Sequence, residues 1–409
     1  MTSIQPHSPL PHALPIPVGF EQCGPIGLVV VQSTSLCNLD CSYCYLPDRQ
    51  KRRVFDLDLL PLLMQRILES PYCGTEFSLV WHAGEPLTLP CSYYDRATEI
   101  IRDSVDRWAD GAVSVEQHVQ TNGTLINDEW CECFRRNRIV VGVSVDGPEA
   151  IHDAHRRFRR GHGSHALVMR GVECLHRHNL PFHAIGVVTA AAMNDPDGMY
   201  RFFRDHGISA VGFNVEEQEG VHATSSMQGL EREAQYRKFL SRFWELSEAD
   251  DFPVLLREFD EVISLIRSGQ RLKMNELTRP YSILSVDWQG NFSTFDPELL
   301  SVATDRYGVF NLGNIKTSSL QDAVSTERFQ KIWQDMAAGV AACSQTCDYF
   351  GLCGGGMGSN KFWERGTLNC SETNACRFST QIPVQVLLER FESGPPLSLN
   401  LPEGDDESV

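Results

Sequence analysis

A regular alternation of two kinds of segment, from about residue 27 to about residue 215, most constrains the fold of this chain. Short runs rich in β-branched residues alternate with stretches that carry apolar residues at helical spacing. This pattern predicts a parallel sheet with right-handed helical crossovers. Six units are too few for an eight-stranded barrel, so the predicted fold class is α/β, a partial (β/α)6 barrel of the TIM type. We expect the six strands at 27–34, 77–84, 113–121, 140–147, 182–190 and 210–217.

Short polar motifs follow the first four predicted strands. The carboxyl ends of parallel strands meet at one edge of a sheet, where α/β proteins bind their ligands. We therefore expect the four motifs to share one site. In chain order they are three cysteines at 37–44, His-Ala-Gly-Glu-Pro at 82–86, Gln-Thr-Asn-Gly at 120–123 and Ser-Val-Asp-Gly at 144–147.

The first motif is C-x-x-x-C-x-x-C, formed by Cys37, Cys41 and Cys44. The first twenty residues lack a basic cluster ahead of an apolar run, so we expect a cytoplasmic protein whose thiols stay reduced. Reduced thiolates select an iron–sulfur cluster or zinc. A structural zinc site needs four ligands, whereas three thiolates leave one metal position open to a small molecule. Three buried structural cysteines, or zinc with a distant fourth ligand, are the alternatives.

Charge and hydropathy exclude two classes of partner. The formal net charge of −17 would repel polyphosphate, so we expect no nucleic acid partner. No stretch reaches the roughly 18 consecutive apolar residues of a membrane helix, so we expect no membrane partner. The cysteine-rich motifs are therefore the best guide to function.

The final third of the chain changes character. We expect a hairpin around Gly290 and Asn291, followed by a second region rich in cysteine and glycine at 343–376. Closely spaced thiols with a long return to a last cysteine fit a complete four-thiolate cluster, and the glycines at 354–356 let backbone amides approach it. Structural zinc is the alternative, because four thiolates suit either metal.

The first cysteine motif, placed after the first strand of a partial barrel, resembles that of the radical S-adenosylmethionine enzymes. The resemblance implies that Cys37, Cys41 and Cys44 hold a [4Fe–4S] cluster whose fourth iron is chelated by the methionine part of S-adenosylmethionine. One electron from the cluster then cleaves the cofactor to methionine and a 5′-deoxyadenosyl radical. An electron donor such as flavodoxin or ferredoxin is the implied partner.

The resemblance also implies contacts to the cofactor at the other strand ends. Glu85 would hold its ammonium group, and Arg156, in a His-Asp-x-x-Arg motif, would bind its carboxylate with a bidentate guanidinium. Tyr43 would lie near the adenine. Ala83 occupies the first glycine position of the family's Gly-Gly-Glu motif, which is a departure from the broad family. The implied cofactor-binding residues are Tyr43, Gly84, Glu85, Gln120, Asn122, Ser144, Asp146 and Arg156.

The second cysteine region resembles the C-terminal SPASM extension of peptide-modifying radical enzymes. That extension commonly holds two auxiliary clusters, but Phe295 stands where an upstream cysteine would lie, and no cysteine occurs between 174 and 343. We therefore predict one auxiliary [4Fe–4S] cluster, with Cys370 as the spare thiol or as a replacement for one of the four ligands. Its expected ligands are Cys343, Cys347, Cys353 and Cys376. We expect ordinary buried thiols at Cys23, Cys73, Cys91, Cys131, Cys133 and Cys174.

Longer phrases, such as "WHAGEPL" and "GNFSTFDPELL", resemble the maturases that form three-residue cyclophanes, of the GrrM/OscB type that acts on glycine-rich-repeat precursor peptides. The resemblance implies a ribosomally made precursor peptide as substrate. The implied product carries a carbon–carbon bond between an aromatic ring and the β-carbon of a residue two positions further on. A base must remove the ring proton. Candidate bases are Glu216, Glu217 and Asp296, with Asp287 as a further possibility.

Several alternatives share these motifs. Within the same class they are a thioether-forming maturase, an epimerase and the sulfatase activator that generates formylglycine. In a different class they are a non-catalytic iron–sulfur electron carrier and a zinc-stabilised binding module, neither of which needs "HAGEP" or an open three-thiolate site.

The expected domain organisation follows the same reading. We predict a proline-rich N-terminal segment at 1–26, the barrel at 27–215 and a helical linker that docks the substrate leader at 216–280. A SPASM-like cluster domain at 281–385 and a C-terminal helix end with an acidic tail at 386–409 would complete the chain.

Overall fold

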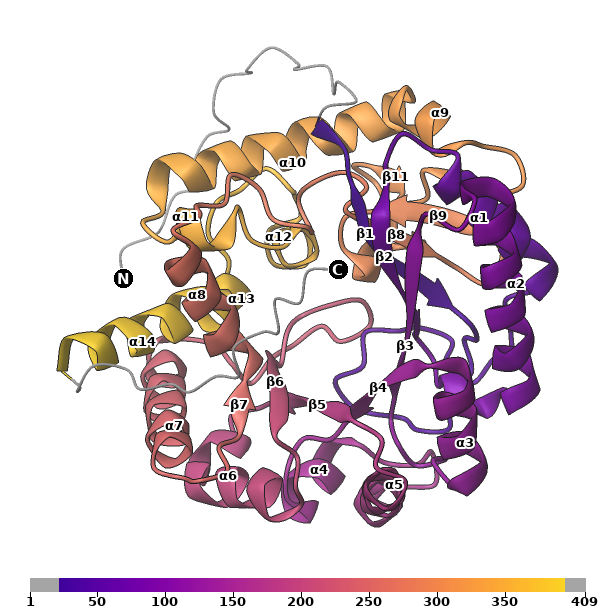
Figure 1. Cartoon of the computed structure of the whole chain (residues 1–409). Helices are drawn as coiled ribbons and strands as arrows, with labels where there is room; N and C mark the ends of the chain where they lie inside the picture. The colour runs from indigo at the N-terminus through magenta and orange to yellow at the C-terminus, as the bar shows by residue number, and fades with distance from the viewer. Residues whose placement is uncertain (1–21, 394–409) are drawn as a thin grey trace.

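The computed structural model describes residues 22–393 (Figure 1). The acidic tail and most of the predicted proline-rich segment lie outside these residues. None of the helices in the described range is long and apolar enough to cross a membrane.

The predicted parallel sheet is confirmed. All six expected strands form, and each pairs in parallel with the next along the chain. Most of their apolar side chains are buried on both faces, as expected for strands covered by helices. The strands are β1 (Ile26–Gln32), β2 (Cys73–His82), β3 (Ser114–Thr121), β4 (Ile139–Ser144), β5 (Phe182–Val188) and β6 (Ala210–Val215).

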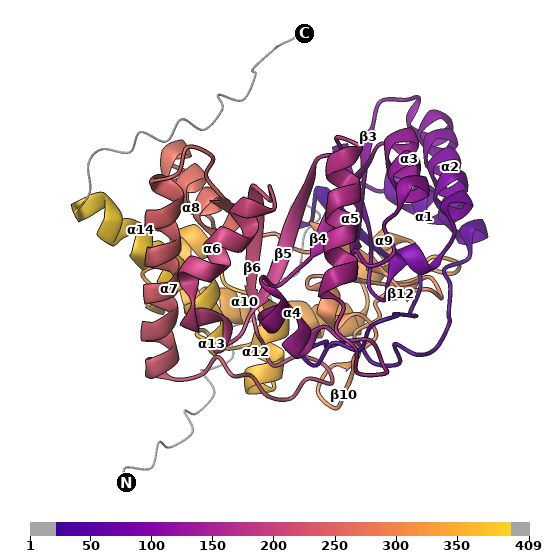
Figure 2. The ribbon, with the colours of Figure 1, turned by 90° about the horizontal axis from the view of Figure 1, so that it is seen from below.

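Helices follow the strands and form the outer layer (Figures 1 and 2). Local sequence sets where they begin: the Asn127 side chain accepts a hydrogen bond of 2.9 Å from the Trp130 N–H, and Pro196 opens α6 after the cap Asp195. The helices are α1 (Leu60–Leu68), α2 (Cys91–Ala109), α3 (Asp128–Asn137), α4 (Glu149–His155), α5 (His165–Arg177) and α6 (Pro196–Asp205).

The sheet continues beyond the barrel at both edges. The short β7 (Leu255–Leu256) pairs with β6, and β8 (Ile283–Val286) pairs in parallel with β1. The predicted hairpin is confirmed: β8 turns at Gly290 into the antiparallel β9 (Asn291–Thr294). With β12 (Gly313–Asn314) on β9, this makes one ten-stranded sheet. The predicted domain boundary near 281 therefore falls inside a continuous sheet, so the C-terminal region is built directly onto the barrel.

The remaining helices close the molecule. Figure 1 shows α10 to α13 on the side of the ring between β1 and β6, and α14 packs against α7 and α8. In chain order these helices are α7 (Leu230–Glu248), α8 (Arg257–Ser268), α9 (Leu320–Val324), α10 (Glu327–Thr346), α11 (Phe350–Cys353), α12 (Gly358–Arg365), α13 (Asn374–Cys376) and α14 (Ile382–Ser393).

Aromatic rings from the residues that flank the hairpin stack on rings of α10. Tyr72 stacks on Tyr281 at 4.6 Å between ring centroids, and Tyr281 stacks on Phe329 at 6.4 Å. Phe295 lies 6.3 Å from both Phe329 and Trp333, with the Trp333 plane tilted by only 4°. Phe295, which occupies the position of the missing upstream cysteine, is thus part of an apolar column.

Two successive residues after β2 have left-handed backbone conformations, with φ of 69° at Ala83 and 66° at Gly84. A Cβ atom on Gly84 would lie 2.3 Å from the carbonyl oxygen of Thr34 and 2.9 Å from that of Leu36, so only glycine lets the two chains approach. Ala83 has a Cβ atom and carries the cost of this conformation, about 1 kcal/mol.

Substitutions at Ala83 and Gly84 are expected to change the melting temperature in opposite directions. Ala83→Gly is expected to relieve the strain and raise the melting temperature of the intact enzyme by about 1–2 °C. Gly84→Ala is expected to lower it by several degrees, because the new methyl group collides with backbone atoms that cannot move away. Differential scanning calorimetry checks both. A lower melting temperature for Ala83→Gly would show that Ala83 is not strained.

Candidate functional site

The loop that carries the first three cysteines is held from several sides. The Cys37 N–H donates to the Arg49 carbonyl at 2.8 Å, and the Glu85 N–H donates to the Leu36 carbonyl at 2.8 Å. The Asp40 N–H donates to the Arg157 carbonyl at 2.7 Å. The motifs after the first, second and fourth strands are therefore joined through backbone hydrogen bonds, as expected from the sheet topology.

The three thiols lie close enough together to affect one another. Burial, the charge of Glu85 and the neighbouring thiols Cys41 and Cys44 raise the pKa of Cys37 to about 12. Burial likewise raises the pKa of Cys41 to about 11, against the opposing effect of Arg156. A metal centre would remove these protons, because a coordinating thiol is deprotonated.

Glu85 lies beside Cys37. Its buried carboxylate accepts hydrogen bonds from the Leu87 N–H at 2.9 Å, the Thr121 hydroxyl at 2.7 Å and the Asn122 N–H at 2.8 Å. The Asn122 side chain lies 3.9 Å from the Cys37 sulfur. A carboxylate offers about four acceptor positions, so one remains for a further donor. This arrangement fits the predicted role of Glu85 in holding an ammonium group.

A second polar group lies beside Cys41. Asp146 accepts hydrogen bonds from the Tyr43 hydroxyl, from Arg156 Nε at 3.0 Å and from the Val187 N–H at 2.9 Å. The Arg156 guanidinium also lies 5.4 Å from the centre of the Tyr43 ring. The predicted residues Tyr43, Asp146 and Arg156 are thus brought together, and Arg156 already has a buried carboxylate partner.

Gln120 and Ser144 lie between these two groups. The Gln120 side-chain amide donates to the Ser144 hydroxyl at 2.9 Å, across the neighbouring strands β3 and β4. All eight predicted cofactor-binding residues therefore occupy the same edge of the sheet, around one loop of three cysteines.

The second cysteine region encloses a cavity of about 370 Å³. The four predicted ligands, Cys343, Cys347, Cys353 and Cys376, all line it, together with Gly355 and Gly356. Cys370 is not among the lining residues, and its thiol points to the Thr367 carbonyl at 3.8 Å. The residues present therefore fit one four-thiolate cluster.

A buried lysine supports an anionic centre there. The ammonium of Lys361, which is 1% exposed, lies 3.6 Å from the Cys343 sulfur. Burying an ammonium is costly unless a negative partner compensates it. A neutral thiol is a poor partner, whereas a thiolate in a metal cluster carries the needed charge.

Carboxylates gather between the two cysteine regions. Asn360 donates to Glu217 at 2.9 Å and to Glu219 at 3.5 Å, and the Ser359 N–H donates to Asp296 at 2.9 Å. Burial raises the pKa of each of these three carboxyls, and the negative charge of Glu298 raises it further. We call Glu217, Glu219, Asp296 and Glu298 the carboxylate cluster.

Burial shapes the protonation of this cluster. Burial, followed by the charge of Glu298, raises the pKa of Asp296 to about 8. Burial raises the pKa of Glu217 to about 7. One carboxylate oxygen of Asp296 is buried and has no hydrogen-bond partner among residues 22–393. Asp296 can therefore hold or accept a proton near neutral pH.

Tyr45 connects the carboxylate cluster to the first cysteine loop. Burial and the charges of Glu298, Cys44 and Glu219 raise the pKa of its hydroxyl. The Val221 N–H donates to the Tyr45 carbonyl at 3.2 Å, which holds the segment after β6 against this loop. The carboxylate cluster therefore borders the residue next to Cys44.

Two other predicted bases have structural partners. Glu216 accepts hydrogen bonds from His222 at 3.1 Å and from the backbone and hydroxyl of Ser226 at 2.8 and 2.5 Å. Asp287 accepts from the Gln289 and Asn291 N–H groups and from the Ser301 hydroxyl, which closes the hairpin. These contacts occupy both carboxylates.

Sequence reasoning missed Glu219, Glu298, Tyr45 and Lys361. The two glutamates stand two residues from predicted bases, and Tyr45 follows Cys44 directly, so their proximity to the motifs was the available signal. Lys361 carried no such signal, because it meets the Cys343 sulfur only when α12 folds back on residues distant in the sequence.

Comparison with known proteins agrees with this geometry. Residues 31–203 match the family model of the radical SAM superfamily. An uncharacterised protein of Synechocystis sp. is 46% identical over 375 residues, which span 92% of this chain and 94% of that protein. A serine-type anaerobic sulfatase-maturating enzyme of Bacteroides thetaiotaomicron is 27% identical, over 83% of this chain and 84% of the enzyme.

Solved structures share the fold. The structure of hexahistidine-tagged anSMEcpe with bound AdoMet superposes with a TM-score of 0.73 at 22% identity, covering 90% of this chain and 94% of that one. Native anSMEcpe with bound AdoMet and the Cp18Cys peptide gives a TM-score of 0.71 at 21% identity, covering 90% and 98%. Residues 31–203, which carry the three-cysteine loop at the end of β1, form a radical SAM domain, and its cofactors are S-adenosylmethionine and a [4Fe–4S] cluster.

Proposed function

We propose that this radical SAM enzyme matures a ribosomally made precursor peptide by forming a cyclophane, a carbon–carbon bond between an aromatic ring and the β-carbon of a residue two positions on. The observation that carries peptide oxidation is Asp296, a buried proton acceptor in the carboxylate cluster beside the first cysteine loop. The phrases shared with cyclophane-forming maturases support this particular reaction. The aromatic column around Phe295, in place of an upstream cluster cysteine, supports it further.

The chain's own residues bind and orient the reactants. Cys37, Cys41 and Cys44 would hold the cluster that binds S-adenosylmethionine, and the cofactor would supply the radical that removes one hydrogen atom from the peptide. Glu85 would hold the ammonium of the cofactor and Arg156 its carboxylate, with Tyr43 near the adenine. Tyr43 and Asp146 fix the Arg156 side chain in place.

The second half of the reaction requires a proton and an electron to leave the peptide. The new bond forms at the ring carbon, and the ring proton passes to Asp296. Cys343, Cys347, Cys353 and Cys376 would hold an auxiliary cluster, which would supply an acceptor for the electron. The peptide thus loses two hydrogens in all. An external donor such as flavodoxin or ferredoxin resupplies the first cluster.

A second candidate is the oxidation of a serine or cysteine side chain to formylglycine in a sulfatase. The named sulfatase-maturating relatives favour it, and both reactions need a base at the same place. Cyclophane formation and serine oxidation remove the same two hydrogens, so intact mass does not separate them.

The decisive experiment is co-expression of the enzyme with each short open reading frame beside its gene, followed by tandem mass spectrometry. A cyclophane is expected to lower the mass by two hydrogens, suppress fragmentation inside a three-residue segment and leave the peptide inert to hydroxylamine. An aldehyde that hydroxylamine captures, in a peptide that fragments normally, would instead establish formylglycine formation.

The cysteine assignments predict iron content. We expect about eight iron atoms per chain in the reconstituted enzyme, for two [4Fe–4S] clusters. The Cys41→Ser variant should lose about four iron atoms and release no 5′-deoxyadenosine. The Cys347→Ser variant should also lose about four iron atoms but still release 5′-deoxyadenosine. Cys370→Ser is the matched control and should keep all of them. Loss of iron in Cys370→Ser would make Cys370 a ligand.

The raised pKa of Asp296 predicts pH dependence. A base must be ionised, so crosslinking should increase as pH rises through about 8. Asp296→Asn should slow crosslinking at least about 100-fold while 5′-deoxyadenosine release continues. Glu298→Gln removes a neighbouring negative charge and should move the pH profile down by roughly 0.5–1 unit.

Rates of crosslinked product between pH 6 and 9 check this, with Glu231→Gln, an exposed carboxylate on α7, as control. A profile that Glu298→Gln leaves in place would argue against proton transfer to the carboxylate cluster.

Replacing Lys361 is expected to change the reduction potential of the auxiliary cluster. Its buried charge stabilises the more negative, reduced state of a neighbouring cluster, so Lys361→Met should lower the reduction potential of the auxiliary cluster. Lys361→Arg keeps the charge and should restore most of the difference. Redox titration followed by electron paramagnetic resonance measures both. Equal potentials in Lys361→Met and the wild type would place the auxiliary cluster away from Lys361.

A further inference from the structure

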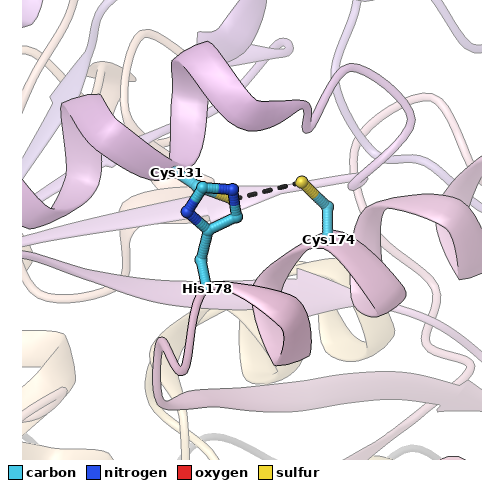
Figure 3. A group of neighbouring side chains, drawn as sticks. All are labelled: Cys131, Cys174 and His178. Carbon is cyan, nitrogen blue, oxygen red and sulfur yellow. Dashed lines mark hydrogen bonds between the residues drawn. The ribbon is translucent and has the colours of Figure 1, made fainter.

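A group of metal-binding side chains lies in the helical layer, outside the site described above. Cys131 is in the first turn of α3, Cys174 is near the end of α5, and His178 caps α5 (Figure 3). One ligand atom from each lies within 4.8 Å of the others. From these residues we propose a zinc site that joins α3 to α5, in place of the ordinary buried thiols expected from the sequence.

The spacing of the sulfur atoms suits a shared metal ion. The Cys131 and Cys174 sulfurs are 3.4 Å apart. Two thiolates bound to zinc at ~2.3 Å in tetrahedral geometry lie about 3.8 Å apart, so a shift of about 0.4 Å is sufficient. A disulfide requires about 2.05 Å, which would draw the two atoms together by more than about 1 Å. The metal site therefore needs the smaller movement.

The third ligand is already oriented. Cys174 and His178 are four residues apart, a spacing that places them on one face of the end of α5. His178 Nδ1 faces the Glu132 carboxylate at 3.3 Å, and Figure 3 shows the opposite edge of the ring beside the two sulfurs. A carboxylate on one ring nitrogen, with the metal on the other, is the usual support of a zinc-bound histidine.

A fourth donor and a charge partner stand next to these three ligands. Asp128 Oδ1 lies 2.8 Å from His178 Nε2 and 3.4 Å from the Cys174 sulfur, so Asp128 or a water molecule can complete four-coordination. Zinc with two thiolates and one carboxylate carries one net negative charge. The Arg177 guanidinium, 3.3 Å from the Cys174 sulfur and 2.5 Å from Asp128, compensates it.

The two cysteines of the proposed zinc site are buried, whereas Asp128 beside them is exposed to solvent. Both cysteines are buried, at 0% and 3% exposure, which protects the thiolates from other reactions. The Asp128 side chain is 70% exposed, so a metal ion can enter from that side. The donor set of two sulfurs and one imidazole is the type that zinc selects. The expected consequence is a link between the helices that follow β3 and β4.

The test counts zinc in the reconstituted full-length enzyme, whose iron–sulfur sites are filled first so that their thiols are not free to bind zinc. Zinc and iron are measured together by inductively coupled plasma mass spectrometry, and zinc K-edge absorption identifies the ligands. We expect about one zinc per chain, with two sulfurs at ~2.3 Å and nitrogen or oxygen at ~2.0–2.1 Å.

The variants locate the site. Cys174→Ser and His178→Ala should retain less than a tenth of the zinc and all of the iron. Cys133→Ser is the matched control: Cys133 is equally buried on α3 but contacts the Cys91 carbonyl instead. His178 is at the surface end of α5, so His178→Ala keeps the test valid if a cysteine variant fails to fold.

Three results would overturn the proposal. They are an enzyme without zinc, zinc that persists equally in Cys174→Ser and His178→Ala, and a Cys131–Cys174 disulfide in peptides from unreduced protein. None of these readouts depends on peptide crosslinking, so the zinc site and the proposed function stand or fall separately.

Discussion

The parallel pairing of β1 with both β2 and β8 is the constraint on which the rest of the structure depends. It makes the first strand of the barrel an interior strand, so the loop after it lies between the barrel and the C-terminal region. Backbone hydrogen bonds from the Glu85, Cys37 and Asp40 N–H groups then hold that loop in place. Tyr45 in that loop is close enough to Glu298 of the C-terminal region for its charge to raise the pKa of the Tyr45 hydroxyl.

Buried positive charges lie beside both cysteine regions. The chain is strongly acidic, yet each cysteine region has a buried cation beside it: Arg156 near Cys41 and Lys361 near Cys343. A buried cation is stable only with an anionic partner. Arg156 has Asp146, whereas within residues 22–393 the Lys361 ammonium lies against the Cys343 sulfur. The second cysteine region is therefore built to carry negative charge.

The features of the fold and the site that could be predicted from the sequence were those determined by neighbouring residues. The six strands, the hairpin at Gly290 and the convergence of the cofactor motifs could be inferred because β-branched runs, turn residues and strand-end rules act over short distances. Lys361 and the pairing of Cys131 with Cys174 could not, since both depend on helices meeting across the fold. The pairing of β8 with β1 could not be inferred either, because it joins strands that are far apart in the sequence.

The carboxylate cluster gives the two cysteine regions a common boundary. On one side Tyr45, the residue after Cys44, lies against Glu298 and Glu219. On the other side Ser359 and Asn360, which bind Asp296 and Glu217, immediately precede Lys361 at the Cys343 sulfur. On the proposed function, this boundary is where a peptide must lose a proton and an electron after its first hydrogen is removed. Asp296, whose pKa burial raises to about 8, can accept that proton when pH approaches this value and its carboxyl is ionised. Placing the proton acceptor between the two thiolate sites therefore allows proton and electron to leave the same ring in different directions, without a mobile base.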